Sequence, residues 1–375
     1  MLTLDGGGIR GLMTLHALSA LEQQLASLSE RPGEFRLSQF FDYFGGTSTG
    51  AIIAAGLARG HSVKFLLSFY EEFGRKVFTS RSLLERWKSL YTDGELKKKL
   101  KVVFGDHDLG PASLESLLLI VAHNVTTDSI WPISSNPDAK YNDTARADCN
   151  LRIPLWKLVR ASTAAPVYFP PEVLELGPRE FVFADGGTTC CNNPAFLLAR
   201  MATEPAYRLN WARGERDLLV VSLGTGSAPV LGAEADNPEN HIPGAVVHTL
   251  GVLMSQAAFD QDLSCRTIGR CVHGASLDRE ILDGIPRVGD TPIPLEEDLG
   301  RAFLYARYDA ELTDAGLAKL SVTGVDPVAV RSLDSVEQMP ALETIGKALG
   351  KTIDTKAFGS FLSLPLAPRL NLDVA

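Results

Sequence analysis

Apolar residues near the start of the chain follow two periodicities that alternate. Residues 2–4 and 41–44 are short apolar runs typical of buried strands, and each leads into a glycine-rich turn. Residues 11–28 repeat leucine at helical spacing, and residues 49–60 are rich in alanine and isoleucine, which also indicates a helix. Strand, glycine turn and helix, occurring twice, predict an α/β fold with a doubly wound, mostly parallel sheet.

Further apolar runs extend this pattern. Strands are predicted at residues 117–124, 181–184 and 217–223, and residues 130–133 are interpreted as a continuation or partner of the first of them. A helix is predicted over residues 154–164. The strand at 181–184 ends directly before an Asp-Gly-Gly turn.

Two longer stretches depart from the strand–helix alternation. Residues 63–101 mix aromatic and basic residues with helical patterning, which fits either a cap with a lipid-facing surface or a packed helical region with a core of aromatics. The portion from 245 to 360 is largely helical, with a Gly- and Pro-rich break at 285–295. Without repeats or a long linker, the sequence predicts one domain over residues 1–360 and a tail at 361–375.

Composition limits which binding partners and which cellular compartment we expect for the protein. The formal net charge is 36 − 45 = −9, which argues against a nucleic-acid polymer as partner, because such a surface needs a basic excess. No apolar run reaches the roughly 20 residues that cross a bilayer, and no signal-peptide pattern precedes the first strand. The 5 cysteines form no Cys-x-x-Cys pair and are typical of reduced thiols, so we expect a cytoplasmic protein.

The turn after residues 41–44 has the Gly-x-Ser-x-Gly form of a nucleophile elbow. Gly46 and Gly50 flank Ser48 and provide the small neighbours that a strained strand-to-helix turn needs. A phosphate-binding P-loop is excluded, because Ala51 stands where that motif requires lysine. Ser48 is therefore the candidate nucleophile, and it would need a base to accept its proton.

The first turn, residues 5–11, reads Asp-Gly-Gly-Gly-Ile-Arg-Gly. Consecutive backbone N–H groups at a helix start suit a developing oxyanion, and we expect those of Gly7 and Gly8 to point at a substrate carbonyl oxygen. Gly6 belongs to the same run. Arg10 either supports this loop by hydrogen bonds, adds positive potential or lies on the surface.

The same turn matches Gly-x-Gly-x-x-Gly, the dinucleotide-binding fingerprint. That fingerprint requires a second strand ending in an acidic residue about 20 residues later. The corresponding stretch, residues 29–34, follows no apolar strand, and Asp5 would repel a pyrophosphate. The sequence favours the oxyanion interpretation.

The third turn carries Asp185, followed by Gly186 and Gly187. A desolvated aspartate can serve as the base for a serine, whereas a turn aspartate often only bonds its own backbone, and the local sequence leaves both open. A histidine base is the usual alternative, with His241 the best placed in the chain order. The histidines are His16, His61, His107, His123, His241, His248 and His273.

Together these motifs resemble the patatin-like phospholipase family. They occur in the family's order over about residues 1–230, and their joint occurrence is very specific although each is modest alone. The matching segments are residues 5–11, 45–50, 161–171, 185–187 with Asn193 and Pro194, and 223–226. The chain departs from the family in its very short stretch before the first strand.

The resemblance implies a three-layer α/β/α fold and a Ser-Asp dyad in place of a Ser-His-Asp triad. Ser48 is then the nucleophile, Asp185 the base, and the N–H groups of Gly6, Gly7 and Gly8 the oxyanion hole. It implies no metal and no cofactor. The expected substrate is a membrane phospholipid, hydrolysed at the inner membrane surface, and a dimer is the favoured oligomer.

The C-terminal portion resembles bacterial patatin-type effectors of anti-phage (CBASS) signalling, in residues 307–312, 333–336 and 345–348. That resemblance implies activation by a cyclic di- or trinucleotide. The alternatives are a housekeeping lipid acyl hydrolase without nucleotide sensing and a non-catalytic lipid-binding module. A nucleotide site needs cationic and aromatic groups, and the candidates are Arg301, Arg307, Tyr308 and Arg331.

Overall fold

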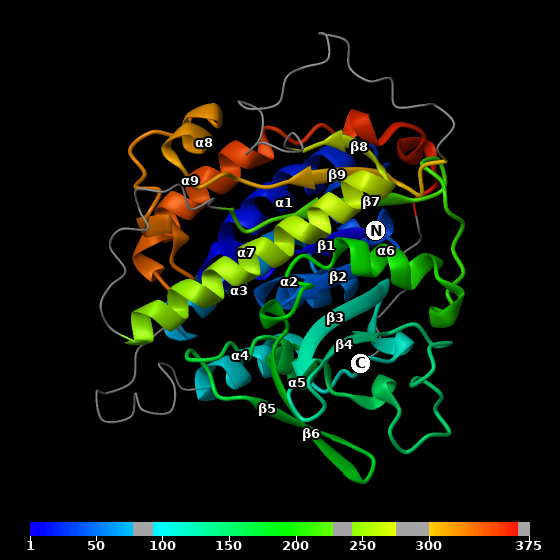
Figure 1. Ribbon diagram of the computed structural model, residues 1–375. Helices are drawn as coiled ribbons and strands as arrows, with labels where there is room; N and C mark the ends of the chain where they lie inside the picture. Colours follow the sequence, from blue (N-terminus) through cyan, green and yellow to red (C-terminus); the bar gives the residue numbers. More distant parts are fainter. Residues whose placement is uncertain (78–92, 228–241, 275–299, 367–375) are drawn as a thin grey trace, which may run out of the picture.

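One sheet runs through the molecule (Figure 1). The computed structural model describes residues 1–77, 93–227, 242–274 and 300–366, and within these residues the sheet has nine strands. The strands are β1 (Leu2–Leu4), β2 (Tyr43–Thr47), β3 (Leu117–Asn124), β4 (Ser129–Ser134), β5 (Glu172–Leu176), β6 (Arg179–Asp185), β7 (Leu219–Leu223), β8 (Arg270–His273) and β9 (Leu304–Tyr308).

The sheet is parallel over most of its width and antiparallel at one end. The strand order is β5-β6-β3-β2-β1-β7-β9-β8, with β4 also paired to β3. Every neighbouring pair from β3 to β8 in this order is parallel, whereas β4 and β6 run antiparallel to β3, and β5 runs antiparallel to β6. The prediction of a mostly parallel sheet is confirmed.

Helices cover both faces of the sheet and make three layers, as predicted (Figure 1). Successive residues of β3 point to opposite faces, so Leu118 and Ile120 join the core beneath α1, α2 and α5, while Leu119 and Val121 join the core beneath α6. The helices are α1 (Gly11–Ala26), α2 (Thr49–Ala58), α3 (Val63–Val77), α4 (Gly94–Phe104), α5 (Leu155–Ser162), α6 (Ala195–Thr203), α7 (Ile242–Ile268), α8 (Asp314–Lys319) and α9 (Met339–Gly350).

The C-terminal portion is largely helical but also adds two strands that the sequence pattern did not predict. β9 pairs with β7 inside the sheet, and β8 extends the sheet beyond β9. All five residues of β9 are buried, including Arg307. Because the charge of Arg307 interrupts the apolar run, the sequence pattern does not indicate a strand there. The Gly- and Pro-rich break at 285–295 lies outside the described residues.

Residues 63–101 form two helices where the structure describes them, α3 and α4, with residues 78–92 outside the described part. The aromatic side chains of Phe69 and Tyr70 on α3 are buried in the core, while Phe65 is exposed. In α3 the packed interpretation therefore applies to Phe69 and Tyr70. Among the described residues, we find no helix with both the length and the apolar character to cross a membrane.

Candidate active site

Ser48 lies in a strained turn between β2 and α2. Its φ of +53° is in the left-handed region, which a residue with a side chain rarely adopts. The flanking glycines are required by close packing, because a Cβ on Gly46 would clash with the Gly50 carbonyl, and a Cβ on Gly50 would clash with the Leu4 carbonyl. The turn has the geometry that the Gly-x-Ser-x-Gly motif predicted.

Ser48 and Asp185 are hydrogen bonded to each other although 137 residues separate them. Ser48 Oγ donates to Asp185 Oδ2 at 2.6 Å. Asp185 is the last residue of β6, and its Oδ1 accepts the Gly187 N–H at 2.7 Å. A Cβ on Gly186 would clash with the Val121 carbonyl, so the first glycine after Asp185 is required by packing against β3.

Burial sets the proton affinity of Asp185. Both Asp185 and Ser48 are buried, and desolvation raises the pKa of Asp185 to about 6, against the lowering effects of the Ser48 and Gly187 hydrogen bonds and of the Arg160 charge. A carboxyl with this pKa is mostly ionised at neutral pH and still binds a proton readily. This is the property that a general base requires.

Ser162 is a further residue of the site that the sequence pattern did not single out. It ends α5, and its Oγ accepts the backbone N–H of Ser48 at 2.9 Å while donating to the Val121 carbonyl at 2.6 Å. The segment at 161–171 carried the family resemblance, but nothing in its spacing pointed to contact with Ser48. Ser162 thus holds the strained turn from a different element.

The backbone N–H groups of Gly6, Gly7 and Gly8, in the glycine loop (residues 5–11), differ in whether they have an acceptor. Gly6 N–H donates to the Asn192 carbonyl at 3.2 Å, and Gly7 N–H donates to Thr49 Oγ1 at 3.2 Å. Gly8 N–H has no acceptor among the described residues, and Gly8 lines the pocket that holds Ser48. Two of the three predicted N–H groups thus have acceptors in the protein, and the role of all three in holding an oxyanion stays a prediction.

Arg10 supports this loop from within the protein. It is buried, and it donates from Nε to the Gly7 carbonyl at 3.4 Å and from Nη1 to the Gly226 carbonyl at 3.3 Å. Tyr70 of α3 donates its hydroxyl to the Gly8 carbonyl. Of the three interpretations of Arg10, the surface position is wrong, and loop support by hydrogen bonds is observed.

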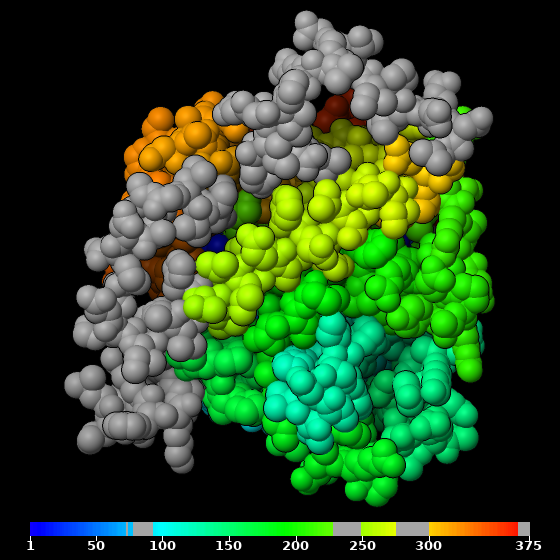
Figure 2. Space-filling view, viewed as in Figure 1, coloured from blue at the N-terminus to red at the C-terminus, as the bar shows by residue number. Residues whose placement is uncertain are grey.

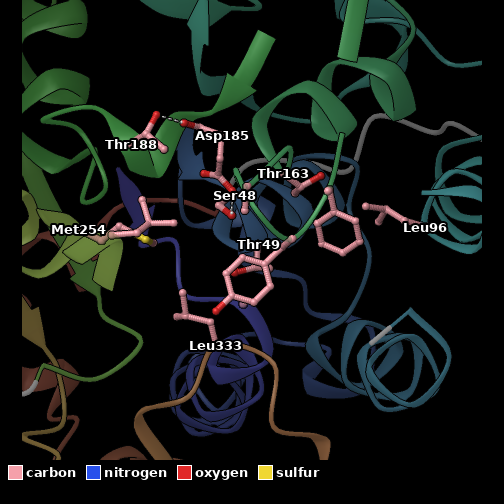
Figure 3. A pocket seen from close by; sticks show the side chains of 13 residues that line it. Ser48, Thr49, Leu96, Thr163, Asp185, Thr188, Met254 and Leu333 are labelled. Atoms are coloured by element: carbon pink, nitrogen blue, oxygen red, sulfur yellow. Dashed lines mark hydrogen bonds between the residues drawn. The ribbon is translucent and has the colours of Figure 1, made fainter. Parts of the chain in front are cut away.

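The pocket around Ser48 is narrow and mainly apolar (Figure 3). Its volume is about 40 Å³. Leu96 of α4 and Met254 of α7 lie on opposite sides of Ser48, and Leu333 closes a third side. Tyr168 and Phe169 also line the pocket. The walls suit a hydrocarbon chain next to the serine hydroxyl.

A family model described as patatin-like phospholipase matches residues 2–199, which is more than half of the chain. The chain belongs to the patatin-like phospholipase family. Within that match lie Ser48, Asp185 and the glycine loop.

Known patatins are moderately similar to this patatin-like chain. Patatin-2-Kuras 1 from Solanum tuberosum is 27% identical over 245 residues, covering 60% of this chain and 62% of the relative. Patatin-17 from Solanum cardiophyllum is 27% identical over 247 residues, covering 60% of each. The chain thus spans about three fifths of the length of these relatives. VipD from Legionella pneumophila matches with 13% identity and a TM-score of 0.37, over 91% of this chain and 66% of VipD.

The histidines of this chain whose side chains the structure describes are not placed as a base for Ser48. His241 lies outside the described residues, and so does the side chain of His248. Among the described residues no histidine is hydrogen bonded to Ser48 or to the Asp185 carboxylate; His123 Nδ1 lies 3.3 Å from Thr188 Oγ1, which donates to the Asp185 carbonyl at 2.7 Å.

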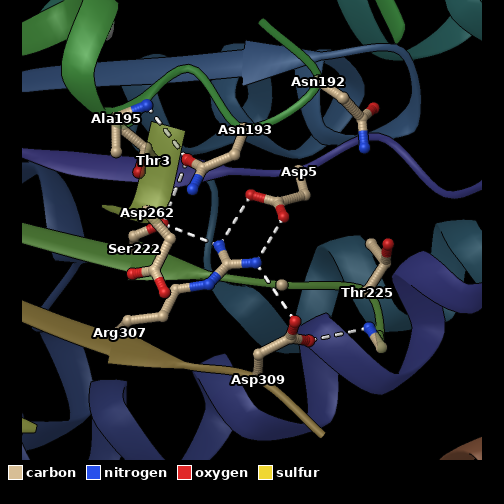
Figure 4. Close-up of polar contacts among 12 residues, drawn as sticks. Thr3, Asp5, Asn192, Asn193, Ala195, Ser222, Thr225, Asp262, Arg307 and Asp309 are labelled. Atoms are coloured by element: carbon tan, nitrogen blue, oxygen red, sulfur yellow. Dashed lines mark hydrogen bonds and ion pairs between the residues drawn. The ribbon is translucent and has the colours of Figure 1, made fainter. Parts of the chain in front are cut away.

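The residues predicted for a nucleotide site are not gathered into one. Arg307 is buried in β9, where its guanidinium donates to both oxygens of Asp5, at 2.8 and 2.6 Å, and to Asp309 at 3.1 Å (Figure 4). Tyr308 is fully buried on the opposite face of the strand. Arg301 and Arg331 bond to the Thr267 and Leu312 carbonyls. Arg307 and Tyr308 are buried residues of the sheet, and the Arg307 guanidinium is ion paired with Asp5 and Asp309, so a role of these residues in a nucleotide site stays a prediction.

No metal site is found within the described parts of the chain, since no three His, Cys, Asp or Glu side chains there are grouped to hold an ion. The polar groups around Ser48 are hydroxyls, backbone amides and one carboxylate. This set provides a nucleophile, a base and N–H donors.

Proposed function

We propose that this chain is a lipid acyl hydrolase of the phospholipase A type, with Ser48 as nucleophile and Asp185 as general base. The observation that carries the proposal is the 2.6 Å hydrogen bond from Ser48 Oγ to Asp185 Oδ2 at the floor of an apolar pocket. A serine hydroxyl becomes a nucleophile when a positioned base accepts its proton. Asp185 is within reach and has a raised pKa.

The acyl-enzyme forms in two steps, attack and collapse of an oxyanion intermediate. Asp185 Oδ2 takes the Ser48 proton while Ser48 Oγ bonds to the ester carbonyl carbon, whose oxygen becomes an oxyanion. When this intermediate collapses, the alcohol part of the lipid leaves with the proton from Asp185, and the acyl group stays on Ser48. A water molecule then gives its proton to Asp185 and attacks the acyl carbon, which releases the fatty acid and returns the proton to Ser48.

Gly8 is the backbone donor that we propose for the oxyanion. Gly8 lines the pocket and its N–H has no acceptor among the described residues, whereas the N–H groups of Gly6 and Gly7 donate to acceptors within the protein. The N-terminus of α2 begins at Thr49, directly after Ser48, and favours negative charge nearby. A single oxyanion donor contributes about 10²–10³ in kcat in comparable sites.

We propose that the acyl group of a lipid reaches Ser48 from a membrane surface along apolar side chains. α7 crosses the visible face of the molecule (Figure 2), and it turns Leu250 and Met254 into the pocket while Leu253 is 58% exposed. Apolar side chains at the pocket and outside it on one helix would let a lipid pass from a bilayer to Ser48. We propose a glycerophospholipid as substrate and the cytoplasmic membrane surface as the place of action.

Two substitutions with matched controls test the dyad. Ser48→Ala and Asp185→Asn should each abolish hydrolysis of phospholipid vesicles and of a soluble 4-nitrophenyl ester while the thermal melt stays cooperative. The controls Ser68→Ala and Asp128→Asn alter exposed residues and should keep activity. Full activity of Asp185→Asn, together with loss in His241→Ala, would replace the dyad by a histidine-dependent triad.

Activation by a cyclic oligonucleotide stays a prediction from the resemblance of the C-terminal portion, and a dimeric state stays a separate prediction. Phospholipid hydrolysis measured with and without a panel of cyclic di- and trinucleotides tests the first. High activity without ligand, and no thermal shift with any member of the panel, would leave a constitutive housekeeping hydrolase. Light scattering coupled to size-exclusion chromatography tests the second.

A further inference from the structure

A second cavity, polar and about 270 Å³ in volume, adjoins the glycine loop. Its walls come from the segments after β1, β7 and β9 and from α7, and Met254 lines both this polar cavity and the apolar pocket. Ligands of doubly wound sheets bind outside the carboxyl ends of the parallel strands, where the strand order changes direction. The polar cavity occupies this position, and its volume suits a small ligand.

The acidic groups of the polar cavity are all paired within the protein. Each carboxylate oxygen of its four acidic residues is already hydrogen bonded or ion paired. Asp5 is paired with Arg307, and Asp262 with Arg266 and Tyr305. Asp309 accepts from Arg307 and from the N–H groups of Gly226 and Ala310. Glu311 is paired with Thr313 and Lys319. A cationic ligand would have to compete with these partners for carboxylates whose charge is already neutralised or hydrogen bonded.

Donors, in contrast, are in surplus. Arg10 lines the cavity, is only 7% exposed and forms no ion pair among the described residues. Two of its five N–H groups are used, both in long bonds to carbonyls, at 3.4 and 3.3 Å. The hydroxyls of Ser227 and Ser255 line the same cavity and have no acceptor within the described part of the chain. A buried cation with open donors favours an anionic, acceptor-rich ligand.

We propose that the polar cavity is a binding site for a small phosphate-bearing ligand, with the Arg10 guanidinium as its main contact. A phosphate group has several acceptor oxygens in a tetrahedral arrangement, so it can accept from donors on different elements at once. Arg10, Ser227 and Ser255 come from three separate segments.

Binding in this cavity would act on the site at Ser48 through the glycine loop. Arg10 donates to the Gly7 carbonyl, Thr225 Oγ1 donates to the Gly6 carbonyl at 2.8 Å, and the Asn192 carbonyl accepts the Gly6 N–H. All three residues line the polar cavity. A phosphate that draws the Arg10 guanidinium from the Gly7 carbonyl shifts the loop that carries Gly8. This effect on turnover rests on the proposed function, whereas binding itself does not.

The binding test uses the full chain with Ser48→Ala, so that no turnover occurs and failure of the proposed hydrolase function leaves the result intact. Calorimetric titration with sn-glycerol 3-phosphate should show saturable binding. Ser255→Leu, which fills the cavity from α7, and Arg10→Gln should each weaken it about tenfold or more, as loss of a charged hydrogen bond predicts. Gln256→Leu alters the next, exposed residue of α7 and should leave the affinity unchanged.

Two phosphate sources are separated by a second titration with phosphatidylglycerol vesicles. Binding of soluble glycerol phosphate that is lost in Ser255→Leu indicates a free small ligand. Binding of vesicles alone, lost in the same variant, indicates a lipid headgroup. Absence of binding to both probes, or equal binding by the Ser255→Leu and Gln256→Leu proteins with unchanged thermal melts, would overturn the proposal. In the active protein, glycerol phosphate should change kcat on a phosphate-free ester, and Ser255→Leu should remove that change.

Discussion

The backbone N–H of Ser48 donates to Ser162 Oγ at 2.9 Å, so α5 holds the strained turn that β2 and α2 form. A residue with a side chain at positive φ costs about 1–3 kcal/mol and persists only where its surroundings fix it. Ser162 is itself fixed by its bond to the Val121 carbonyl of β3. The same bond takes up the Ser48 N–H, so this group is not free to hold an oxyanion.

Ser162→Ala should lower both stability and activity. The change leaves the buried Ser48 N–H without its acceptor, at a cost of about 1–3 kcal/mol, measured by urea denaturation. Because the turn loses its fixed geometry, kcat on a soluble ester should fall by about tenfold or more. Ser135→Ala is the matched control, since Ser135 Oγ accepts the Leu118 N–H of β3 at 2.8 Å. It should lose similar stability and keep kcat, and an equal loss of kcat in both variants would refute the positioning role of Ser162.

The residues of the candidate site were predictable where a local motif demands a special backbone. Gly46, Gly50 and Gly186 are each required by a clash that a Cβ would cause, so Ser48 and Asp185 could be found from their neighbours. Contacts between distant segments left no such signal. Ser162 lies 114 residues from Ser48, and its hydroxyl could equally have capped a helix.

The fold was predictable where strands are mainly apolar and was missed where a charge lies within a strand. β3 and β7 are mainly apolar and carry no Asp, Glu, Lys or Arg, and both were predicted. β9 contains Arg307, whose charge is neutralised by Asp5, about 300 residues earlier in the chain. The pairing of Gly6 and Gly7 N–H groups within the protein depends on Asn192 and Thr49 in the same way, and no local pattern indicates it.

Activity should depend on the protonation of Asp185. Burial raises the pKa of this carboxyl to about 6. Only the ionised form can accept the Ser48 proton, so kcat/KM for a soluble ester should rise with pH through about 6 and then reach a plateau. Stopped assays from pH 4.5 to 8 in constant ionic strength measure this profile. A flat profile between pH 5 and 7 would contradict a base with the raised pKa of Asp185.

The buried carboxylate of Asp185 should also reduce stability at neutral pH. Its pKa is about 6 in the folded protein against an ordinary value of 3.8, so the unfolded chain binds fewer protons between these values and stability falls as pH rises through them. This difference in pKa corresponds to roughly 2–3 kcal/mol above pH 6. Asp185→Asn should therefore stabilise the protein at pH 8, and the gain should shrink towards pH 4.

Urea denaturation of Asp185→Asn at both pH values measures that difference. Asn can still accept the Gly187 N–H and can donate to Ser48 Oγ, so the turn keeps its bonds. Asp128→Asn changes a carboxyl that is 95% exposed and should leave stability unchanged at either pH. Equal stability of Asp185→Asn and the parent protein at pH 8 would show that burial of the carboxylate carries no desolvation penalty.

Thr49→Val should disturb the position of the glycine loop while the side-chain volume at residue 49 stays the same. Thr49 Oγ1 accepts the Gly7 N–H at 3.2 Å, and valine keeps the side-chain volume while removing the acceptor. A free Gly7 N–H lets the loop that carries Gly8 shift, so kcat should fall by about tenfold with little change in KM, as expected when a transition-state contact of Gly8 is weakened. Thr203→Val removes a hydroxyl bond to the Ala199 carbonyl in α6 and should leave kcat unchanged. A rise in KM at constant kcat would instead place Thr49 in ground-state binding.

The contributions of Asp5 and Arg307 to the free energy of unfolding should depend strongly on each other, because the two side chains form one ion pair. Both side chains are buried, and they join the ends of β1 and β9 beside the glycine loop (Figure 4). Arg307→Met leaves Asp5 and Asp309 without their shared guanidinium, and breaking a buried pair in this way costs about 3–5 kcal/mol. Asp5→Asn should cost less, because Asp309 continues to neutralise Arg307. The double variant should lose less stability than the sum of the two single changes, because with both changes made neither Asp5 nor Arg307 remains as a buried charge without the other.

Lys347→Met is the control: it breaks the exposed pair with Glu343 and should cost below about 1 kcal/mol. If urea denaturation gave Arg307→Met and Lys347→Met the same small loss, or strictly additive losses for the double variant, the network at Arg307 would not hold β1 and β9 together.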